Sequence, residues 1–251
     1  MPDRSDVIYV YDGSFDGFLC AIFEAFESKE TPSRITTEHG CQVTFSDTIK
    51  NIETEPEKSD RIADGIQKKL GQACYERVYY AYLSLEEDAG RVSLVWLRKA
   101  FREGSEILLK LNEDIVIRMD TLKRRVGREA HLLRGFVRFS EMENGVYFSE
   151  ISPQYNVLPI IMPHFAERYN TMPFLLHDKT HMLAGIYDTK EWYLTSSEGL
   201  EIPDYAPREK EYRRLWKTFY DTIGIKERYN PRCRMRLMPK YFWKNMTEFK
   251  D

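Results

Sequence analysis

The sequence predicts an α+β protein with an N-terminal strand–helix piece, a helical middle, and a C-terminal antiparallel sheet with flanking helices. Two periodicities and one dipeptide predict this class. Apolar side chains recur at three and four residues through the middle of the chain, then alternate with period two around Asn144-Gly145, a strong hairpin signal. We expect one unit, 1–251, with three sub-regions: 1–56, 57–133 and 134–251.

The N-terminal piece reads as strand, turn and helix. The β-branched and aromatic run "VIYVYDG" ends at Asp12-Gly13, and "SFDGFLCAIFEAFESK" continues at helical spacing behind Ser14, a plausible N-cap. His39-Gly40 indicates a hairpin or bulge further on. The "DGSFDG" turn resembles the start of a calcium loop, but its twelfth position is Phe23, so we expect a tight turn stabilised by local carboxylate caps.

The middle of the chain is predicted to be helical. A first helix begins at Pro56, "ACYERVYYAYLSL" and "VSLVWLRKAFREG" follow, and "MDTLKRRVGREAHLLRG" closes at Gly135. Beyond the hairpin, "NVLPIIMPHFAERYN" predicts a helix entered at Pro159, while "PFLLHDKTHMLAGIYDT" and "EWYLTSS" predict strands. The last long helix is "EKEYRRLWKTFYDTIGI". Its predicted apolar face consists of Tyr212, Leu215, Trp216, Phe219, Tyr220 and Ile223.

Composition narrows the class of protein. No apolar run approaches the roughly 18 residues of a membrane span, and the N-terminus lacks the order of a signal peptide, so we expect a cytoplasmic protein without a membrane partner. The four cysteines, Cys20, Cys41, Cys74 and Cys233, are too scattered for a CxxC pair. We therefore expect neither a metal nor a cofactor.

Charge is strongly segregated along the chain. Residues 1–60 hold 5 basic and 13 acidic side chains, whereas residues 208–251 hold 13 basic and 6 acidic ones. Residues 118–138 add 7 basic and 2 acidic side chains. A chain with a net charge of −3 can therefore still present one cationic face.

The first cationic element is the helix that contains "LKRRVGREAHLLR". Arg124, Arg128 and His131 share one stripe of this helix, Arg125 lies beside them, and only Glu129 interrupts the positive charge. A nucleic-acid contact and an ordinary solvated helix face both fit this pattern.

The second cationic element is "NPRCRMRLMPKYFWKNM". Read as an extended segment, it directs Arg232, Arg234 and Arg236 to one side and its apolar residues to the core, before Pro239 starts a short helix with Lys240 and Lys244. Guanidinium groups bind phosphates in a bidentate manner, so we favour a nucleic-acid-binding element over a solvated tail. His164 and Arg168, one helical turn apart, either hold a phosphate or cover the sheet.

Several stretches together resemble a bacterial family of unknown function described as probable DNA-metabolism proteins. They are "YVYDGSFDGFLCAIFEAF", "RMDTLKRRVGREAHLLRGFVRF", "YFSEISPQYNVLPIIMPHFAERYN", "FLLHDKTHMLAGIYD" and "RCRMRLMPKYFWKNMTEF". The resemblance implies a radical-SAM protein as a genomic neighbour and a uracil-DNA-glycosylase-family domain as an occasional fusion partner. This chain has neither the glycosylase domain nor the three-cysteine cluster of a radical-SAM enzyme, so such chemistry would belong to partners.

We therefore expect a non-catalytic DNA-binding or adaptor component of a DNA repair or modification system, with single- or double-stranded DNA as its ligand. Two alternatives stay open: an enzyme acting on nucleic acid or nucleotides near His164, Arg168 and His177, and a protein-only scaffold for the radical-SAM partner. The predicted nucleic-acid-binding residues are Arg124, Arg125, Arg128, His164, Arg168, Arg232, Arg234, Arg236, Lys240 and Lys244.

Overall fold

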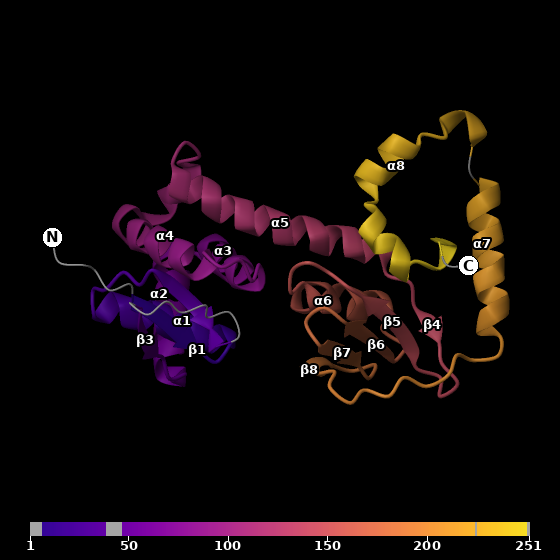
Figure 1. Cartoon of the computed structure of the whole chain (residues 1–251), viewed down its shortest axis with the longest axis horizontal. Coiled ribbons are helices and arrows are strands. Elements are labelled where there is room, and N and C mark those ends of the chain that lie inside the picture. Colours follow the sequence, from indigo (N-terminus) through magenta and orange to yellow (C-terminus); the bar gives the residue numbers. More distant parts are fainter. Residues whose placement is uncertain (1–6, 39–46, 224, 250–251) are drawn as a thin grey trace. The chain divides into compact units, whose positions relative to one another are not determined.

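The computed structural model of the chain describes residues 7–38, 47–223 and 225–249 (Figure 1). It confirms the predicted α+β class. Its contacts divide the chain into two compact units, unit 1 up to Gly127 and unit 2 from Arg128 onward. The division falls inside one continuous helix, α5 (Asp114–Phe136).

Unit 1 contains a three-stranded parallel sheet in the order β2-β1-β3. Its strands are β1 (Val7–Tyr11), β2 (Arg34–Thr37) and β3 (Thr48–Asn51). Helix α1 (Phe15–Glu27) follows β1 directly, which confirms the predicted strand, turn and helix. The predicted hairpin at His39-Gly40, like Cys41, lies outside the described residues.

The turn between β1 and α1 is held by local side-chain caps, as the sequence predicts. The Asp12 carboxylate accepts hydrogen bonds from the Ser14 backbone N–H at 2.9 Å, the Ser14 hydroxyl at 2.6 Å and the Thr54 hydroxyl at 2.8 Å. The Ser14 hydroxyl in turn caps α1 by accepting from the Gly17 N–H at 2.9 Å. These bonds make the "DGSFDG" stretch a capped turn at the start of α1.

The helices of unit 1 enclose its core. They are α2 (Pro56–Leu70), α3 (Gln72–Leu83), α4 (Ala89–Glu103), the 3₁₀ segment η2 (Gly104–Leu109) and the first part of α5. Trp96 of α4 and Leu19 of α1 are fully buried among them. Gly90 lets α4 approach β2, because a Cβ atom at this position would lie 2.5 Å from the Cβ of Ile35.

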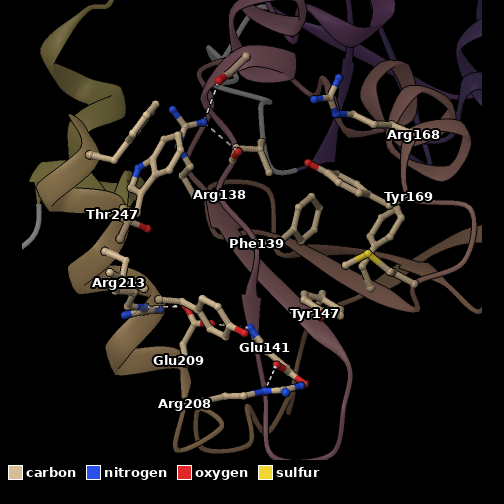
Figure 2. Close-up of a pocket in the computed structure, with 18 residues that line it drawn as sticks. Arg138, Phe139, Glu141, Tyr147, Arg168, Tyr169, Arg208, Glu209, Arg213 and Thr247 are labelled. Carbon is tan, nitrogen blue, oxygen red and sulfur yellow. Dashed lines mark hydrogen bonds and ion pairs between the residues drawn. The ribbon is translucent and has the colours of Figure 1, made fainter. Parts of the chain in front are cut away.

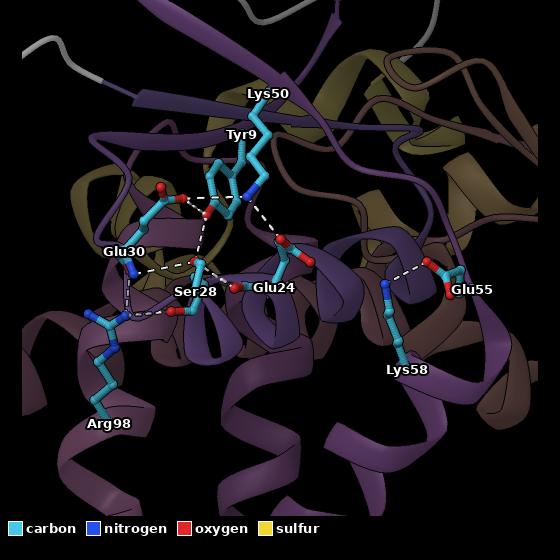
Figure 3. Close-up of polar contacts among 9 residues, drawn as sticks. Tyr9, Glu24, Ser28, Glu30, Lys50, Glu55, Lys58 and Arg98 are labelled. Atoms are coloured by element: carbon cyan, nitrogen blue, oxygen red, sulfur yellow. Dashed lines mark hydrogen bonds and ion pairs between the residues drawn. The ribbon is translucent and has the colours of Figure 1, made fainter.

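A polar network ties the end of α1 to the sheet of unit 1 (Figure 3). Lys50 of β3 donates to Glu24 at 2.9 Å, and the Tyr9 hydroxyl of β1 donates to Glu30 at 2.5 Å. Arg98 of α4 donates to the Ala25 carbonyl at 2.7 Å and also to the carbonyl of Glu30. Part of the negative charge of the N-terminal region is therefore neutralised by ion pairs within unit 1.

Unit 2 is built on a five-stranded sheet in the order β4-β5-β6-β7-β8. The strands and the helix between the second and third of them are β4 (Ser140–Glu141), β5 (Tyr147–Ile151), α6 (Leu158–Arg168), β6 (Phe174–Asp178), β7 (Leu183–Tyr187) and β8 (Trp192–Ser196). The predicted antiparallel arrangement is confirmed for three of the four pairings, including the hairpin at Asn144-Gly145. β5 and β6 are instead parallel, because α6 carries the chain back across the sheet between them.

Helix α6 covers one face of this sheet. A Cβ atom at Gly185 of β7 would lie 2.4 Å from the Met162 sulfur of α6, so Gly185 faces the helix. Leu176 is the register partner of Gly185 and shares that face. Because successive strand residues alternate, His177 points to the opposite face.

The chain ends in a series of helical segments. These are α7 (Glu209–Ile223), η3 (Lys226–Arg228), α8 (Pro231–Leu237), η4 (Lys240–Asn245) and η5 (Thr247–Phe249). Helix α7 has the predicted amphipathic pattern, but its apolar residues are largely exposed: Tyr212 by 57%, Leu215 by 53%, Phe219 by 51% and Ile223 by 62%. Of the helices in the described ranges, none has the length and apolar character needed to cross a membrane.

Candidate functional site

The cations of α5 face solvent. Arg124, Arg125 and Arg128 are all exposed, as the helical stripe predicts. Arg125 forms an ion pair with Glu86 at 2.7 Å. Among the described residues, no carboxylate lies within ion-pair distance of Arg124 or Arg128, so these two guanidiniums are open to an anionic ligand.

Glu129, the single acid in this stretch, is withdrawn from the surface. Only 3% of it is exposed. Its carboxylate accepts hydrogen bonds from the backbone N–H of Gln154 at 2.9 and 3.1 Å, from the N–H of Tyr155 at 2.9 Å, and from the Tyr241 hydroxyl at 3.2 Å. The interruption that Glu129 makes in the sequence is therefore absent from the surface of the helix.

The second cationic element has a different conformation from the one expected. The prediction of an extended row of arginines is wrong, because residues Pro231–Leu237 form helix α8. Pro231 occupies the first turn, and the Asn230 side chain caps the helix by accepting from the Cys233 N–H at 3.0 Å. Arg232 and Arg236 share a helical face and are exposed, whereas Met235 and Leu237, expected in the core, are 36% and 60% exposed.

Arg234 is held by aromatic rings of its own unit. Its guanidinium carbon lies 5.0 Å from the ring centre of Trp243, 5.6 Å from that of Phe249 and 5.7 Å from that of Tyr229. Trp243 stacks on Phe249 with ring centres 4.4 Å apart. Arg234 thus packs α8 against η4 and η5, and its primary role is structural.

The two cationic elements meet in unit 2. Phe242 of η4 is buried and packs edge-on against Phe136 of α5, with ring centres 5.1 Å apart. The adjacent Tyr241 makes the hydrogen bond to Glu129. Lys240 and Lys244 of the same short helix are exposed, so η4 brings its lysines to the end of α5 that carries Arg128 and Arg134.

Unit 2 also has a cleft of about 1050 Å³ (Figure 2). One wall is α7, with Tyr212, Trp216 and Phe219. The opposite side, formed by Tyr147 of β5 and by Arg168 and Tyr169 at the end of α6, is labelled in Figure 2. The sequence predicts the helices and the strand that carry these side chains, but it gives no signal that the two walls face one another.

Three of the four arginines that line the cleft are paired. Arg208 binds Glu141 in a bidentate contact at 2.9 and 2.7 Å, and Arg213 binds Glu209 at 2.9 Å (Figure 2). Arg138 pairs with buried Glu248 at 2.8 Å and lies 5.4 Å from the ring centre of Trp216, which itself donates to Glu248. Within the described part of the chain, the fourth arginine, Arg168, has no ion-pair partner and rests on the Tyr169 ring at 5.8 Å.

Two further basic side chains, Arg134 and His164, lie along α6 but do not line the cleft. Arg134 donates to the Ile160 carbonyl at 3.3 Å, which holds its guanidinium against α6. His164 lies on the same helix, one turn before Arg168. Burial and the neighbouring charges of Arg134 and Arg168 lower the pKa of His164, only partly offset by Glu167.

His177, the third member of the alternative enzyme site, is not brought together with His164 and Arg168. It lies on the sheet face away from α6, beside Phe148, and its Nε2 atom is 3.1 Å from the Ser197 hydroxyl. Burial lowers the pKa of His177. The residues named for that site therefore do not form one reaction centre.

Another histidine, which was not among the predicted site residues, contacts a carboxylate. His181 Nδ1 lies 2.7 Å from Asp178, whose other carboxylate oxygen accepts from the Thr180 and His181 backbone N–H groups. This is a side-chain-capped turn between β6 and β7. Within the described ranges, no three or more histidine, cysteine or acidic residues are grouped so that they could hold a metal ion.

The geometry defines a class: an α+β protein whose C-terminal unit carries an exposed cationic surface and an aromatic cleft. Residues 87–248 match the model of a family described as a domain of unknown function, DUF4130, and the chain belongs to this family. The match includes all of unit 2 up to Glu248, and the stretch resembling the family at residues 9–26 lies outside it. No curated protein matches the chain.

Proposed function

We propose that the protein is a non-catalytic nucleic-acid-binding component of a DNA repair or modification system in the cytoplasm. Its contact with DNA is the basic surface of unit 2, which we define as Arg128, Arg134, Arg232, Arg236, Lys240 and Lys244. The observation that supports this proposal most is the junction at Glu129 and Tyr241, where both cationic elements meet while the intervening acid is buried.

The charge on this surface fits a polyanion better than a structural role. Within the described chain, no carboxylate lies within ion-pair distance of any of the six side chains. Arg134 is exposed and donates to a carbonyl, and the Lys240 ammonium lies 5.9 Å from the ring centre of Trp243. Arg234, by contrast, is not exposed and is bound by aromatic rings. Unpaired cations in one region repel one another, and phosphates relieve that repulsion while releasing counterions. The proposed surface therefore uses Arg128 and the lysines and leaves Arg234 as a scaffold residue.

The adaptor part of the proposal rests on the family resemblance. Members of the resembled family occur with a radical-SAM protein and with a uracil-DNA-glycosylase-family domain, so we assign the chemistry to these two partners. The protein would hold DNA for them. A purified preparation should therefore release no base from uracil-containing DNA, and turnover that is lost on replacing His164 or His177 would establish an enzyme instead.

The test of DNA binding is the salt dependence of affinity for a labelled duplex. The logarithm of the affinity should fall with the logarithm of salt concentration by about 0.9 for each phosphate contact. The double variant Lys240→Glu, Lys244→Glu should flatten this slope by roughly two and weaken all sequences alike. Arg91→Glu is the matched control, because Arg91 is exposed on α4 of unit 1, outside the basic surface.

Two results would oppose the proposal. One is an affinity that does not change with salt. The other is an absence of binding at low salt, and either would favour the protein-only scaffold for a radical-SAM partner, with the basic surface meeting an acidic protein.

A further inference from the structure

The cleft is a second feature of unit 2. Binding of the phosphate backbone of a DNA duplex to the basic surface would not involve it. Its volume of about 1050 Å³ lies just above the range of small-molecule sites, roughly 300–1,000 Å³. It combines an apolar wall with a cationic corner. A surface that only neutralises duplex phosphates has no use for the apolar wall.

The apolar wall consists of large side chains that the fold leaves open. Tyr212 is 57% exposed, Phe219 is 51% exposed and Trp216 is 39% exposed. Trp216 is also fixed in orientation, since its indole N–H donates to buried Glu248 at 3.1 Å and Arg138 lies over its ring. Fixed, half-exposed aromatic rings provide flat surfaces at little cost in side-chain entropy.

The cationic corner of the cleft is Arg168 at the end of α6, and two further basic side chains, Arg134 and His164, lie along the same helix without lining the cleft. Arg168 lines the cleft without a carboxylate partner in the described chain, and the Ile160 carbonyl holds Arg134 at the same helix. Glu167, the acid adjacent to Arg168, is exposed and has no ion pair with any described residue. Three basic groups are therefore gathered with little neutralising charge, as in a phosphate site.

We propose that the cleft receives unpaired bases of single-stranded nucleic acid, which stack on the aromatic wall of α7 while a backbone phosphate binds at Arg134, His164 and Arg168. This inference rests on the proposed function and adds single-strand selectivity to it. Paired bases in a duplex are stacked and inaccessible, so the cleft would bind only strands whose bases are free.

The charges of the cleft favour this occupant over an apolar peptide or a second copy of the chain. Its lining carries four arginines and two glutamates, so it is net positive. An apolar helix would cover α7 but would desolvate Arg168 without a partner, at a cost in binding free energy. A nucleotide supplies both a flat π face and an anion, and aromatic stacking with arginine contacts is the usual way that proteins bind single strands.

The test compares full-length protein variants on oligothymidylate and on a duplex of the same length. The wild-type protein should prefer the single strand. Phe219→Ala and Arg168→Gln should each weaken oligothymidylate binding at least about fivefold while leaving duplex binding unchanged. Lys190→Gln is the charge-matched control, because Lys190 is exposed in the β7–β8 turn and does not line the cleft.

A second readout follows the histidine directly. A phosphate beside His164 favours its charged form, so saturating oligothymidylate should raise the pKa of His164 measured by NMR. In the free protein, burial and then the charges of Arg134 and Arg168 lower this pKa. A purely structural role of His164 predicts no such change. This measurement also remains informative if a substitution in the cleft impairs folding.

The outcomes separate the two proposals. Equal binding of single strand and duplex, unaffected by Phe219→Ala and Arg168→Gln, overturns the cleft inference and leaves the basic surface standing. A wild-type dimer that Phe219→Ala converts to monomer, with oligothymidylate binding intact, overturns it too and identifies α7 as a subunit interface. Absence of binding to any nucleic acid removes both proposals.

Discussion

Replacing Glu129 tests the junction that joins α5 to the C-terminal segments. In Glu129→Ala, the backbone N–H groups of Gln154 and Tyr155 lose their acceptor inside unit 2. A buried donor left without an acceptor costs about 1–3 kcal/mol, so the two donors together predict a loss of about 2–6 kcal/mol in the free energy of unfolding. Loss of the Tyr241 contact adds to this value.

Glu129→Gln separates charge from shape. The amide oxygen can accept from one of the two N–H groups, but the amide nitrogen presents a donor to the other. We therefore expect about half the loss of the alanine variant, about 1–3 kcal/mol. Tyr241→Phe removes only the hydroxyl and should cost about 0.5–1.5 kcal/mol.

The assay is urea unfolding followed by tryptophan fluorescence. Three of the four tryptophans, Trp192, Trp216 and Trp243, belong to unit 2, so the signal reports mainly on that unit. Glu198→Ala is the matched control because Glu198 is exposed in the same unit, and it should change stability by less than about 0.5 kcal/mol. A loss below about 1 kcal/mol for Glu129→Ala, at an unchanged denaturant slope, would refute the reasoning.

Three further predictions concern unit 1 and the cysteines. Gly90→Ala should destabilise unit 1 by about 1–3 kcal/mol, because the new Cβ atom clashes with Ile35. Gly65→Ala should instead stabilise helix α2 by about 0.5–1 kcal/mol, because its Cβ atom would lie 3.9 Å from Phe101 without a clash. Equal shifts in the melting temperatures of the two variants would contradict this pair of predictions. The hydrogen bond from Arg118 holds the pKa of Asp88 below its ordinary value. The resulting stability should therefore be present at neutral pH and lost only as the pH falls below about 4, through the lowered pKa, and an acid limb unchanged in Arg118→Met would disprove the link. Burial raises the pKa of the Cys20 and Cys74 thiols, so a thiol reagent followed by peptide mapping should modify exposed Cys233 well before either of them.

Local signals in the sequence predicted most of the elements. Ser14 as an N-cap, Pro56 as a helix start and Asn144-Gly145 as a hairpin each act over a few residues, and the structure confirms all three. The helix at Pro231–Leu237 was missed because alternating charges suggested a strand. The Asn230-Pro231 pair already contained the cap and the first-turn proline that start this helix.

Pairings between distant segments were harder to predict. The parallel pairing of β5 with β6 had a signal, since a helix separates two strand patterns there, as in other crossover units. The burial of Glu129 had none, because its partners Gln154 and Tyr241 are brought to it only by tertiary folding. The cleft likewise depends on where α7 packs, which an amphipathic pattern leaves open.

The parallel pair β5–β6 has a consequence for the order in which unit 2 folds. Only the short turns 179–182 and 188–191 separate β6, β7 and β8 in the chain. These strands can therefore pair on the time scale of hairpin formation, about 1–10 μs. The β5–β6 pairing must instead wait until α6 has formed and crossed, which closes a longer loop. We expect this pairing to be the late, rate-limiting step, and slowing of refolding by substitutions in α6 rather than in the β7–β8 turn would reveal it.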